Sequence, residues 1–463
     1  MKSGNTNECT LVFDVGKTNV KFIVLNNDGS ILDIRKTDNN SQLMSPYTAI
    51  NVDRIWAWFK EQAKVLSKTY SIDVISISAH GASAALVDLE TGELILPVMD
   101  YEFDEFPALK PSYDTLRSPY FETFSPNLPG GLNLGRQLHY QMSLLNEGER
   151  RRASILLYPN YWAWRLTGVA STEVTSLGCH TDLWDPQNNY FSSLAKTVGL
   201  ADKFPPMIEA WKPVGTVLDR VSRETGLDTR CRVMPGVHDS NAGYVPYIDL
   251  NSEKRSTVVS TGTWVIAMSL DTPLENLKEQ SDMLANVDIS GQPLATARYM
   301  GGREFEEICR VTKCSVNDQC TVGDIEYEIS EGNMALPSFI NGCGPFPSQK
   351  GKIIGKYQNG KALATLYASL MLDHLLTSLR SLGDVVIEGS FAKNEQLCSL
   401  LAALRPDQKI YTNADVGGIV DGCFCLAHWD KNIKKPDLPI VQPLKNIKLA
   451  QYADQWRLTL SDL

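Results

Sequence analysis

Residues 11–25, LVFDVGKTNVKFIVL, place a charged, glycine-containing turn between two apolar runs. Small Gly16 and Thr18 would let backbone N–H groups approach an anion, and Lys17 would add positive charge. Asp14 would repel a phosphate unless a divalent cation stood between them, so its carboxylate suits a magnesium shell. The chemistry indicated is phosphate binding with Mg²⁺, although an ordinary hairpin with a turn-forming Asp fits this stretch equally well.

The same pattern returns at residues 256–270, STVVSTGTWVIAMSL. Thr261, Gly262 and Thr263 form a polar turn between two apolar runs and could cradle phosphate from the other side of a cleft. Alone, this turn is a weak signal. Its repetition of the first pattern predicts a duplicated architecture with one phosphate turn in each half.

A third stretch, VMPGVHDSNAG at residues 233–243, presents His238 and Asp239 where a helix should begin. A hydroxyl that attacks phosphorus must lose its proton, and Asp239 is the candidate base that orients the hydroxyl and accepts this proton. The structural alternative for Asp239 is a helix N-cap, and His238 could be only a hydrogen-bonding residue of the framework.

A fourth stretch, VVIEGSFAKNEQL at residues 385–397, ends an apolar run in a glycine turn before a predicted helix. Gly389 and Ser390 could admit a nucleotide, and the amide of Asn394 offers hydrogen bonds that suit adenine. The alternative is a plain strand-to-helix connection with Asn394 in the first helical turn.

Strands and helices must hold these turns in place. Residues 10–14, 20–25 and 30–34 are predicted to form an antiparallel meander, with a hairpin turn between the second and third strands. Helical periodicity over residues 52–70, followed by an apolar run at 73–81, predicts a helix and then a strand. This order is typical of a layered α/β domain.

Further elements follow the same logic. Residues 84–88 and 94–99 are predicted to pair as a second hairpin, and the apolar face of residues 361–383 predicts a long helix. The 463 residues, 43% of them hydrophobic, exceed what one core usually supports. We expect two domains, residues 1–245 and 246–463, with the boundary near Ala242–Asn251.

The composition narrows the function classes. A formal charge of -10 and a pI near 5.3 argue against nucleic acid and anionic membranes as partners. The start carries no signal-peptide pattern, and no stretch offers 18 uninterrupted apolar residues, which favours a cytoplasmic protein. The ten cysteines show no pair of CxxC units, and a zinc site at Cys309, Cys314 and Cys320 would lack its fourth ligand.

The motifs FDVGKTNVK, GVHDSNAG, STGTW and EGSFAKN, in this order over nearly the whole chain, resemble those of the FGGY carbohydrate kinases. The resemblance implies an α/β fold of two actin-like, ribonuclease-H-like domains with nucleotide and sugar in the cleft between them. It implies ATP and Mg²⁺ as cofactors. The implied reaction is phosphate transfer from ATP to an alcohol group of a small-molecule sugar.

The resemblance also implies roles for individual residues. Asp239 would be the catalytic base, and Asp14 and Asp239 would hold the metal. The residues implied to bind ATP and its phosphates are Gly16, Lys17, Thr18, Thr261, Gly262, Thr263, Gly389, Ser390 and Asn394. The residues implied to bind the sugar are His80, Gly81, Ser83, Tyr101, Asn133, Gln137, His238 and Asp239.

Within the family, TARYMGGREFEEI and ISISAHGASAALVD look most like the L-fuculose and L-rhamnulose kinase branch, which phosphorylates 6-deoxyketohexoses. Ser83 stands where that branch often has an acidic residue. A charged hydrogen bond to the sugar, worth roughly 1.5–3 kcal/mol, would then be replaced by a neutral one worth about 0.5–1.5 kcal/mol. Residues 101–103 lack the frequent Asp and following Arg. The turn at 388–391 has one glycine where two or three are common, so ATP is expected to sit differently or more weakly.

Other functions remain open from the sequence. The substrate could be another ketose or polyol, such as xylulose or ribulose, and a sugar or nucleotide sensor could keep the cleft without turnover. A dinucleotide-dependent oxidoreductase is a third alternative, but no GxGxxG follows the first strand. The expected partners are the sugar and ATP, and a homodimer is the expected candidate assembly.

Overall fold

The computed structural model describes residues 8–105, 110–248, 256–270, 272–414, 417–431, 438–445 and 448–461. Its contacts divide the chain into two units. Unit 1 comprises Met1–Pro246, Ala285–Pro293 and Gly417–Lys435, and unit 2 comprises Tyr247–Leu284, Leu294–Val416 and Pro436–Leu463. Residues 249–251, which belong to the expected boundary between residues 1–245 and 246–463, lie outside the described residues.

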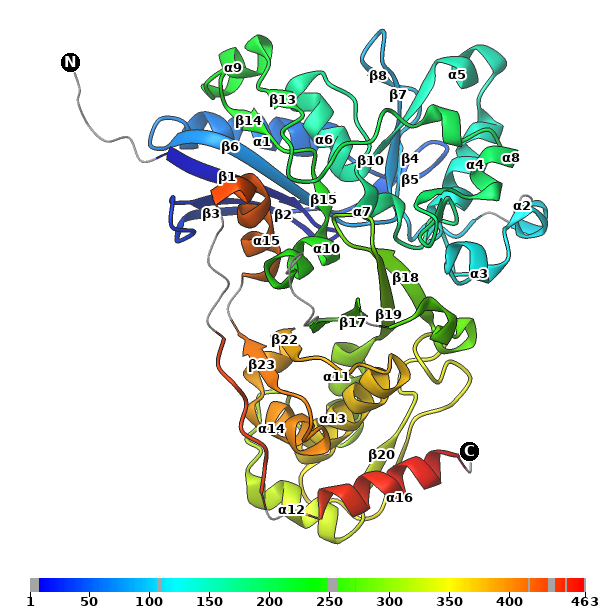
Figure 1. The fold of residues 1–463 in the computed structure, drawn as a ribbon, viewed down its shortest axis with the longest axis vertical. Coiled ribbons are helices and arrows are strands. Elements are labelled where there is room, and N and C mark those ends of the chain that lie inside the picture. The colour runs from blue at the N-terminus through cyan, green and yellow to red at the C-terminus, as the bar shows by residue number, and fades with distance from the viewer. Residues whose placement is uncertain are drawn as a thin grey trace. The chain divides into compact units, whose positions relative to one another are not determined.

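The main sheet of unit 1 has the strand order β13-β14-β6-β1-β2-β3, with β15 also paired to β6 (Figure 1). Its strands are β1 (Glu8–Val15), β2 (Asn19–Leu25), β3 (Ile31–Asp38), β6 (Ser71–Ala79), β13 (Gly215–Thr216), β14 (Arg232–Val233) and β15 (Val237–His238). The antiparallel meander of β1, β2 and β3 is confirmed. Strand β6 runs parallel to β1 with Ala79 opposite Val15, so both strands end together and the loops that follow them start side by side.

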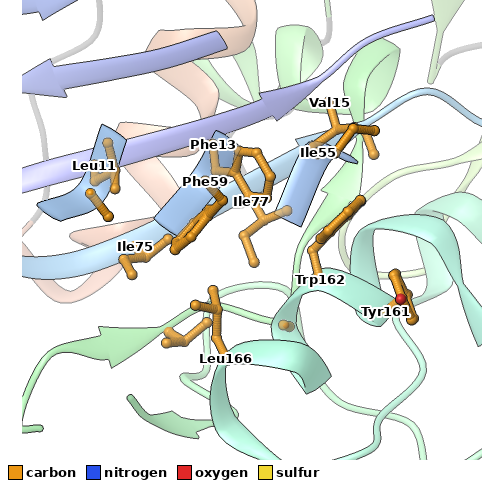
Figure 2. Close-up of a cluster of buried hydrophobic side chains, with 14 of the residues drawn as sticks. Leu11, Phe13, Val15, Ile55, Phe59, Ile75, Ile77, Tyr161, Trp162 and Leu166 are labelled. Carbon is orange, nitrogen blue, oxygen red and sulfur yellow. The ribbon is translucent and has the colours of Figure 1, made fainter. Parts of the chain in front are cut away.

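Helix α1 (Val52–Leu66) directly precedes β6 in the chain, which confirms the predicted helix and strand. Its first turn is capped by Asn51, whose side chain accepts a hydrogen bond from the Arg54 N–H. Inward-facing residues of α1 pack on the sheet, as Figure 2 shows for Ile55 and Phe59 beside Phe13. This packing anchors the end of β1, from which the first turn extends.

Aromatic rings dominate this core. Phe13 meets Phe22, Phe59 and Trp162 edge-on, with ring centroids 5.2, 5.0 and 5.4 Å apart. Such edge-to-face contacts add to the burial of large apolar surfaces. Trp162 belongs to α6 (Tyr158–Thr167), so this helix is fixed against the same end of the sheet (Figure 2).

Three small sheets complete unit 1. They are β10-β7-β8, β4-β5-β9 and β11-β12. Their strands are β4 (Gln42–Met44), β5 (Tyr47–Ile50), β7 (Ala84–Asp88), β8 (Glu93–Leu94), β9 (Val98–Met99), β10 (Ala153–Leu157), β11 (Trp184–Asp185) and β12 (Tyr190–Phe191).

The prediction of one strand over residues 94–99 is wrong. Leu94 pairs with Val87 of β7, whereas Val98 pairs with Ile50 of β5 in a different sheet. Pro97 separates the two short strands, and proline has no N–H to continue a ladder. The chain therefore changes sheets at this residue.

The remaining helices of unit 1 include one from the far end of the sequence. They are α2 (Lys110–Leu116), α3 (Tyr120–Thr123), α4 (Leu134–Leu144), α5 (Glu147–Arg152), α7 (Val174–Leu177), α8 (Ser193–Thr197), α9 (Asp219–Thr225), α10 (Asp239–Tyr244) and α15 (Gly418–Ala427). Helix α15 packs on α10 (Figure 1), and a Cβ on Gly422 would lie 1.8 Å from the Ala242 carbonyl oxygen. Only glycine permits this approach.

The central sheet of unit 2 follows the order β19-β17-β16-β22-β23. Its strands are β16 (Thr257–Thr261), β17 (Val265–Ser269), β19 (Pro293–Tyr299), β22 (Val385–Gly389) and β23 (Ile410–Asn413). Strand β18 (Met283–Val287) precedes β19 in the chain, and the chain passes from one unit to the other within it. Strand β20 (Met334–Leu336) pairs with β21 (Lys352–Ile354). Strand β16 is antiparallel to β17 and parallel to β22, with Thr261 opposite Gly389. These are the relations of β1 to β2 and β6, as the duplicated pattern predicts.

The helices of unit 2 are α11 (Gly301–Val311), α12 (Val322–Ser330), α13 (Gly360–Ser378), α14 (Glu395–Leu404) and α16 (Leu449–Ser461). The predicted long helix is confirmed as α13, which is buried over most of its length. Such a helix forms the core of a unit rather than a surface layer. In the part of the chain that the structure describes, no helix combines the length and apolar character needed to cross a membrane.

Candidate active site

The first turn, between β1 and β2, has a backbone fixed by hydrogen bonds. The Gly16 N–H donates to the Asn19 carbonyl over 3.0 Å, and the Asn39 side-chain amide donates to the Gly16 carbonyl over 2.8 Å. A Cβ on Gly16 would lie 3.1 Å from the Asn19 oxygen, which is tighter than most real contacts. Thr18 is exposed at the tip. The turn is therefore preformed, with Thr18 available to a ligand.

Lys17 is held by two acidic residues of unit 1. Its ammonium pairs with the Asp100 carboxylate and lies 3.4 Å from a carboxylate oxygen of Glu102. It also lies 4.8 Å from the ring centroid of Tyr101. Lys17, predicted to bind phosphate, is thus fixed beside residues 100–102, and a phosphate would have to share it with Asp100.

Asp14 is almost buried just before this turn. Its Oδ1 accepts from the Ser78 hydroxyl over 2.8 Å, and its Oδ2 accepts from Lys21 Nζ over 3.2 Å. Burial raises the pKa of Asp14, Lys21 and Ser78 lower it, and the negative charge of Asp239 raises it further. Asp14 and Asp239 therefore belong to one electrostatic cluster.

Two neighbouring carboxylates fit a magnesium ion that phosphate oxygens and water also coordinate, because Mg²⁺ is usually bound through one or two carboxylates plus substrate phosphates. Asp14 and Asp239 repel each other in the absence of a cation. Among the described residues, no group of three or more His, Cys, Asp and Glu could hold a metal without such additional ligands. The carboxylates of Asp14 and Asp239 therefore suit a metal ion that binds together with the phosphates of a nucleotide.

Asp239 is the first residue of α10, and its side chain is 25% exposed. Its Oδ1 accepts from the Ser240 N–H over 2.6 Å and lies 3.3 Å from His238 Nε2. The cap position is occupied by His238, which makes no side-chain capping bond. The N-cap alternative for Asp239 is therefore wrong, and a partly open carboxylate remains to be explained.

His238 has contacts on both ring nitrogens. Nδ1 lies 2.6 Å from the Asn241 side-chain oxygen, and Nε2 faces Asp239. A Cβ on Gly81 would lie 2.8 Å from Nε2, so the Gly81 backbone packs directly on the ring. Burial lowers the pKa of His238, but the negative charges of Cys179 and Asp239 outweigh burial and raise it to about 10. Because protein groups enclose His238, little space is left beside its ring for the predicted contact with the sugar.

His80 and Ser83 follow β6 and carry buried polar atoms without a partner in the described part of the chain. These atoms are Nε2 of His80 and Oγ of Ser83. His80 Nδ1 lies 2.9 Å from the Gly81 carbonyl and donates to it, and burial lowers the pKa of His80, which favours a neutral ring. Nε2 then carries a lone pair. Buried polar atoms are usually satisfied, so both atoms indicate a hydrogen-bonding ligand.

Tyr101 lies in the same cluster. Its ring centroid is 5.5 Å from that of His80 in an edge-on arrangement. Burial raises the pKa of Tyr101, and the charges of Glu102 and Asp239 raise it further. Asp239 also acts electrostatically on His80. The structure thus brings His80, Tyr101 and Asp239 together.

Asn133 and Gln137 occupy different positions from those expected of sugar ligands. Asn133 is fully buried, and its side chain bonds the Leu128 N–H, the Pro126 carbonyl and the Asp182 carboxylate. The Gln137 amide donates to the carbonyls of Ala82 and Gly131 over 2.6 and 2.5 Å. Both side chains hold loops, and Gln137 braces the residue beside Ser83.

Sequence reasoning missed several residues of the unit 1 cluster. Ser78 and Asp100 hold Asp14 and Lys17, and Cys179 acts on His238. Ser78 had a signal, because a polar residue in an apolar parallel strand is unusual. The contacts of Asp100 and Cys179 depend on tertiary folding, and their neighbouring residues gave no indication of them.

In unit 2 the second turn borders a cavity of 850 Å³. It is lined by Gly262, Thr263, Gly302, Phe305, Glu306, Val316, Asn317, Asp318, Gln319, Cys320, Thr321, Lys361, Ser390, Phe391, Lys393, Asn394 and Gln396. A Cβ on Gly302 would lie 2.1 Å from the Gly262 carbonyl oxygen, so α11 begins in direct contact with the turn. This volume is in the range of small-molecule and cofactor sites.

Gly389 and Thr261 form a second close backbone contact. Gly389 has φ +81°, and a Cβ there would lie 2.0 Å from the Thr261 carbonyl oxygen. The Thr261 hydroxyl donates to the Glu388 carbonyl and accepts from the Phe391 N–H over 2.9 Å. Thr261 and Gly389 therefore shape the wall, whereas Thr263 and Ser390 border the cavity itself.

Asn394 caps helix α14. Its side-chain oxygen accepts from the Leu397 N–H over 3.1 Å, and its amide nitrogen lies 3.4 Å from the Thr365 hydroxyl. Both ends of the amide have protein partners, although the residue borders the cavity. Gly302 and Lys361 are cavity residues that sequence reasoning missed. The Gly301-Gly302 pair, which opens α11, was the available signal for the first of them.

Comparison with known proteins identifies the class. Residues 9–101 match the N-terminal domain of the FGGY family of carbohydrate kinases, and residues 253–436 match the carbohydrate kinase FGGY C-terminal domain. A carbohydrate kinase structure from Novosphingobium aromaticivorans is 33% identical, with a TM-score of 0.89 and 99% of each chain covered. The chain belongs to the FGGY family of carbohydrate kinases.

Particular relatives differ in their substrates. The chain is 28% identical to an L-fuculokinase from Salmonella typhi over 273 residues, 56% of each protein, so the match spans about half of that curated relative. A ligand-bound xylulose kinase from Lactobacillus acidophilus has a TM-score of 0.75 at 14% identity, covering 98% of this chain and 96% of its own. The second likeness concerns the fold, which is the expected pair of actin-like domains.

Proposed function

We propose that this protein is an ATP-dependent kinase that phosphorylates a primary hydroxyl of a ketose, most specifically a 6-deoxyketohexose such as L-fuculose or L-rhamnulose. The observation that carries the proposal is the partly open carboxylate of Asp239, which lies in one electrostatic cluster with Asp14 and His80. A cavity beside the glycine turn of unit 2 supports ATP as the donor.

Asp239 accepts the proton of the sugar hydroxyl while the hydroxyl oxygen forms a bond to the γ-phosphorus of ATP. The bond between this phosphorus and the bridging oxygen breaks, and ADP leaves with the electron pair. Asp14 and Asp239 would hold Mg²⁺, which screens phosphate charge when it is bound. Thr18 in unit 1 and Thr263 in unit 2 offer their hydroxyls to the phosphates, and Gly16 and Gly262 shape the turns that present them.

The sugar subsite in unit 1 suits neutral hydroxyls. His80 Nε2 accepts from a sugar hydroxyl, and the Ser83 hydroxyl either donates or accepts. Tyr101 lies beside His80 and completes the proposed contacts. The L-fuculokinase relative supports a 6-deoxyketohexose, and xylulose is the second candidate, because a xylulose kinase from Bacillus subtilis is 23% identical over 273 residues.

The partners proposed are the sugar and ATP, and the location proposed is the cytoplasm. A net charge of -10 supports small-molecule partners over nucleic acid. A homodimer is the proposed assembly.

An ADP-release assay with a panel of ketohexoses and ketopentoses tests this function. We expect the highest kcat/KM with a 6-deoxyketohexose. A higher kcat/KM with xylulose or ribulose would identify that ketopentose, rather than a 6-deoxyketohexose, as the substrate. The absence of ketose-stimulated ADP with every sugar, while isothermal calorimetry still detects sugar or ATP binding, would replace the kinase with a sensor.

A further inference from the structure

Helix α11 ends in a turn that brings two cysteines together. The Cys314 N–H donates to the Cys309 carbonyl over 2.9 Å, and the Lys313 N–H donates to the Arg310 carbonyl over 3.2 Å. Lys313 has φ +59°, the left-handed conformation in which many helices end. These features define a Schellman motif, whose outermost bonded residues frequently have side chains in contact. Here both of these residues are cysteines.

The two thiols interact and differ in their access to solvent. Burial raises the pKa of the Cys309 thiol to about 12, and a side-chain hydrogen bond with Cys314 and the charge of Cys314 also raise it. Cys309 is buried, whereas Cys314 is partly exposed, and neither belongs to a disulfide. Because the thiolate is the reactive form of cysteine, Cys309 alone is a poor nucleophile. A reagent from solvent therefore meets Cys314 first, with Cys309 directly behind it.

The chain that follows this pair forms part of the unit 2 cavity. Residues 316–321 line the cavity and begin two positions after Cys314. Their loop is fastened to the start of α13, because Lys361 Nζ donates to the Asp318 carbonyl over 2.5 Å. Lys361 also lines the cavity. A movement of Cys314 is therefore passed to the cavity wall.

The sulfur of Cys314 also lies close to the first residue of α13. A Cβ on Gly360 would lie 3.1 Å from this sulfur and 2.2 Å from the Thr312 hydroxyl oxygen. The Thr312 hydroxyl itself lies 3.4 Å from the Cys314 sulfur. The dithiol therefore packs between the end of α11 and the start of α13, and both helices contribute residues to the cavity.

We propose that Cys309 and Cys314 are a reversible disulfide site, that a low-molecular-weight disulfide such as glutathione disulfide oxidises them, and that their oxidation weakens nucleotide binding in the unit 2 cavity. Disulfides of this kind in cytosolic proteins are transient and serve redox sensing. The effect on the nucleotide rests on the proposed function, whereas formation of the disulfide does not.

The exchange proceeds in two balanced steps. The Cys314 thiol loses its proton to solvent, and its thiolate attacks one sulfur of glutathione disulfide, so that a glutathione thiolate leaves with the electrons of the broken S–S bond. Cys309 then loses its proton and attacks the Cys314 sulfur of the mixed disulfide, and the second glutathione thiolate leaves. The two glutathione thiolates take up two protons. The protein pair is oxidised by two electrons, and glutathione disulfide is reduced to two thiols.

The disulfide changes the distance between the two residues. A disulfide bond holds its sulfur atoms at about 2.05 Å, which is shorter than any contact between thiols. Cys314 must therefore move toward α11 and draw the loop of residues 316–321 with it. Because the loop is fastened to α13 through Lys361, its displacement should distort the cavity wall.

The first test detects the disulfide without any activity measurement. The full chain is incubated with excess glutathione disulfide and digested with trypsin without reduction. Cleavage after Arg310 and Lys313 places Cys309 and Cys314 on separate peptides, so the disulfide should hold these peptides together until dithiothreitol is added. Cys314→Ser should abolish the linked pair. Cys320→Ser is the matched control, because it removes another thiol of the same peptide and should leave the link intact.

The second test measures ATP binding by calorimetry before and after oxidation. We expect the Kd for ATP of wild type to rise about fivefold on oxidation, at the low end of ordinary coupling between sites, and to return on reduction. Cys314→Ser should not respond. Cys425→Ser, at a partly exposed position in unit 1, should respond like wild type.

Two results would overturn the proposal. The first is the absence of linked peptides in oxidised wild type, or a link to Cys309 that persists in Cys314→Ser. The second is a disulfide that forms while the Kd for ATP stays the same, since this would separate the site from the cavity. Failure of the reduced wild type to bind ATP would instead count against the proposed function, and the peptide test would still decide whether the disulfide forms.

Discussion

The two glycine turns occupy equivalent places in the two units but differ in chemistry. The first follows β1 and is surrounded by charge, with Asp14 bound by Lys21 and Lys17 bound by Asp100. The second follows β16 and is formed by close backbone contacts, such as the approach of Gly302 to the Gly262 carbonyl. Charged groups need partners when no ligand is present, whereas a backbone cradle needs only space.

This difference indicates that the two turns, which occupy equivalent places in their sheets, have different roles. Unit 1 concentrates ionisable groups around Asp239, so substitutions there should act on the rate of phosphate transfer. Unit 2 offers shape around an 850 Å³ cavity, so substitutions there should act on the apparent affinity for ATP. If kcat and KM effects do not separate in this way, the comparison of the two turns fails.

The largest effect is expected for Asp239→Asn. Removing the base should lower kcat by a factor of about 10²–10⁴, because an amide cannot accept the hydroxyl proton. Binding of the sugar, measured by calorimetry, should change little. Asp228→Asn, a change at an exposed position in the same unit, is the control. A kcat within twofold of wild type would remove Asp239 from the role of base.

Gly302→Ala should raise the KM for ATP by about tenfold, since its new Cβ would lie 2.1 Å from the Gly262 carbonyl and force the turn away from α11. Gly323→Ala in α12 is the matched control, because a Cβ there meets only the Thr321 hydroxyl at 3.8 Å. Steady-state kinetics with varied ATP distinguishes the two variants. Equal KM values for both would show that the contact does not shape the nucleotide site.

Ser83→Ala should raise the KM for the sugar roughly two- to tenfold, as expected for the loss of one neutral hydrogen bond of about 0.5–1.5 kcal/mol. Its thermal stability should stay the same or increase, because the Ser83 hydroxyl is buried without a partner in the described protein. Kinetics and a melting curve on the same sample give both values. Reduced stability with unchanged KM would make Ser83 a structural residue.

The smallest effect on kinase activity concerns Glu173, which bonds Thr175 beneath His238 without touching either turn. Burial raises the pKa of Glu173 from 4.5 to about 8. The folded state therefore holds a proton that the unfolded state loses, and this stabilisation is present below pH 4.5 and is lost as the pH rises through about 8. Relative to wild type, Glu173→Gln should gain stability steadily across this interval in melting curves. A constant difference would mean that Glu173 is ionised throughout.

Periodicity and turn chemistry predicted the strands and helices around the site well. The meander, α1, β6 and α13 followed from apolar spacing, and the repeated turns indicated the duplication. The prediction failed at Pro97, where the chain changes sheets. Local pattern carries no information about which sheet a strand joins.

For the site, motif spacing could identify which segments matter but not which atoms are already in use. Asn133 and Thr261 lie in the expected segments, yet their side chains bond other parts of the protein. Such assignments depend on tertiary neighbours such as Asp182 and Glu388. His80 and Ser83, by contrast, retain buried polar atoms without partners among the described residues, and this distinction is visible only in the fold.

Helix α15 has a consequence for synthesis of the protein. Residues 418–427 pack on the helix that carries Asp239, the Thr10 hydroxyl lies 2.7 Å from His428 Nε2, and Trp211 stacks on Trp429. A nascent chain that has left the ribosome as far as Pro246 lacks all three contacts, so its first unit must wait for unit 2 to be translated before it can close. Expression of the amino-terminal half alone should therefore yield an incompletely folded chain that chaperones bind and proteases degrade.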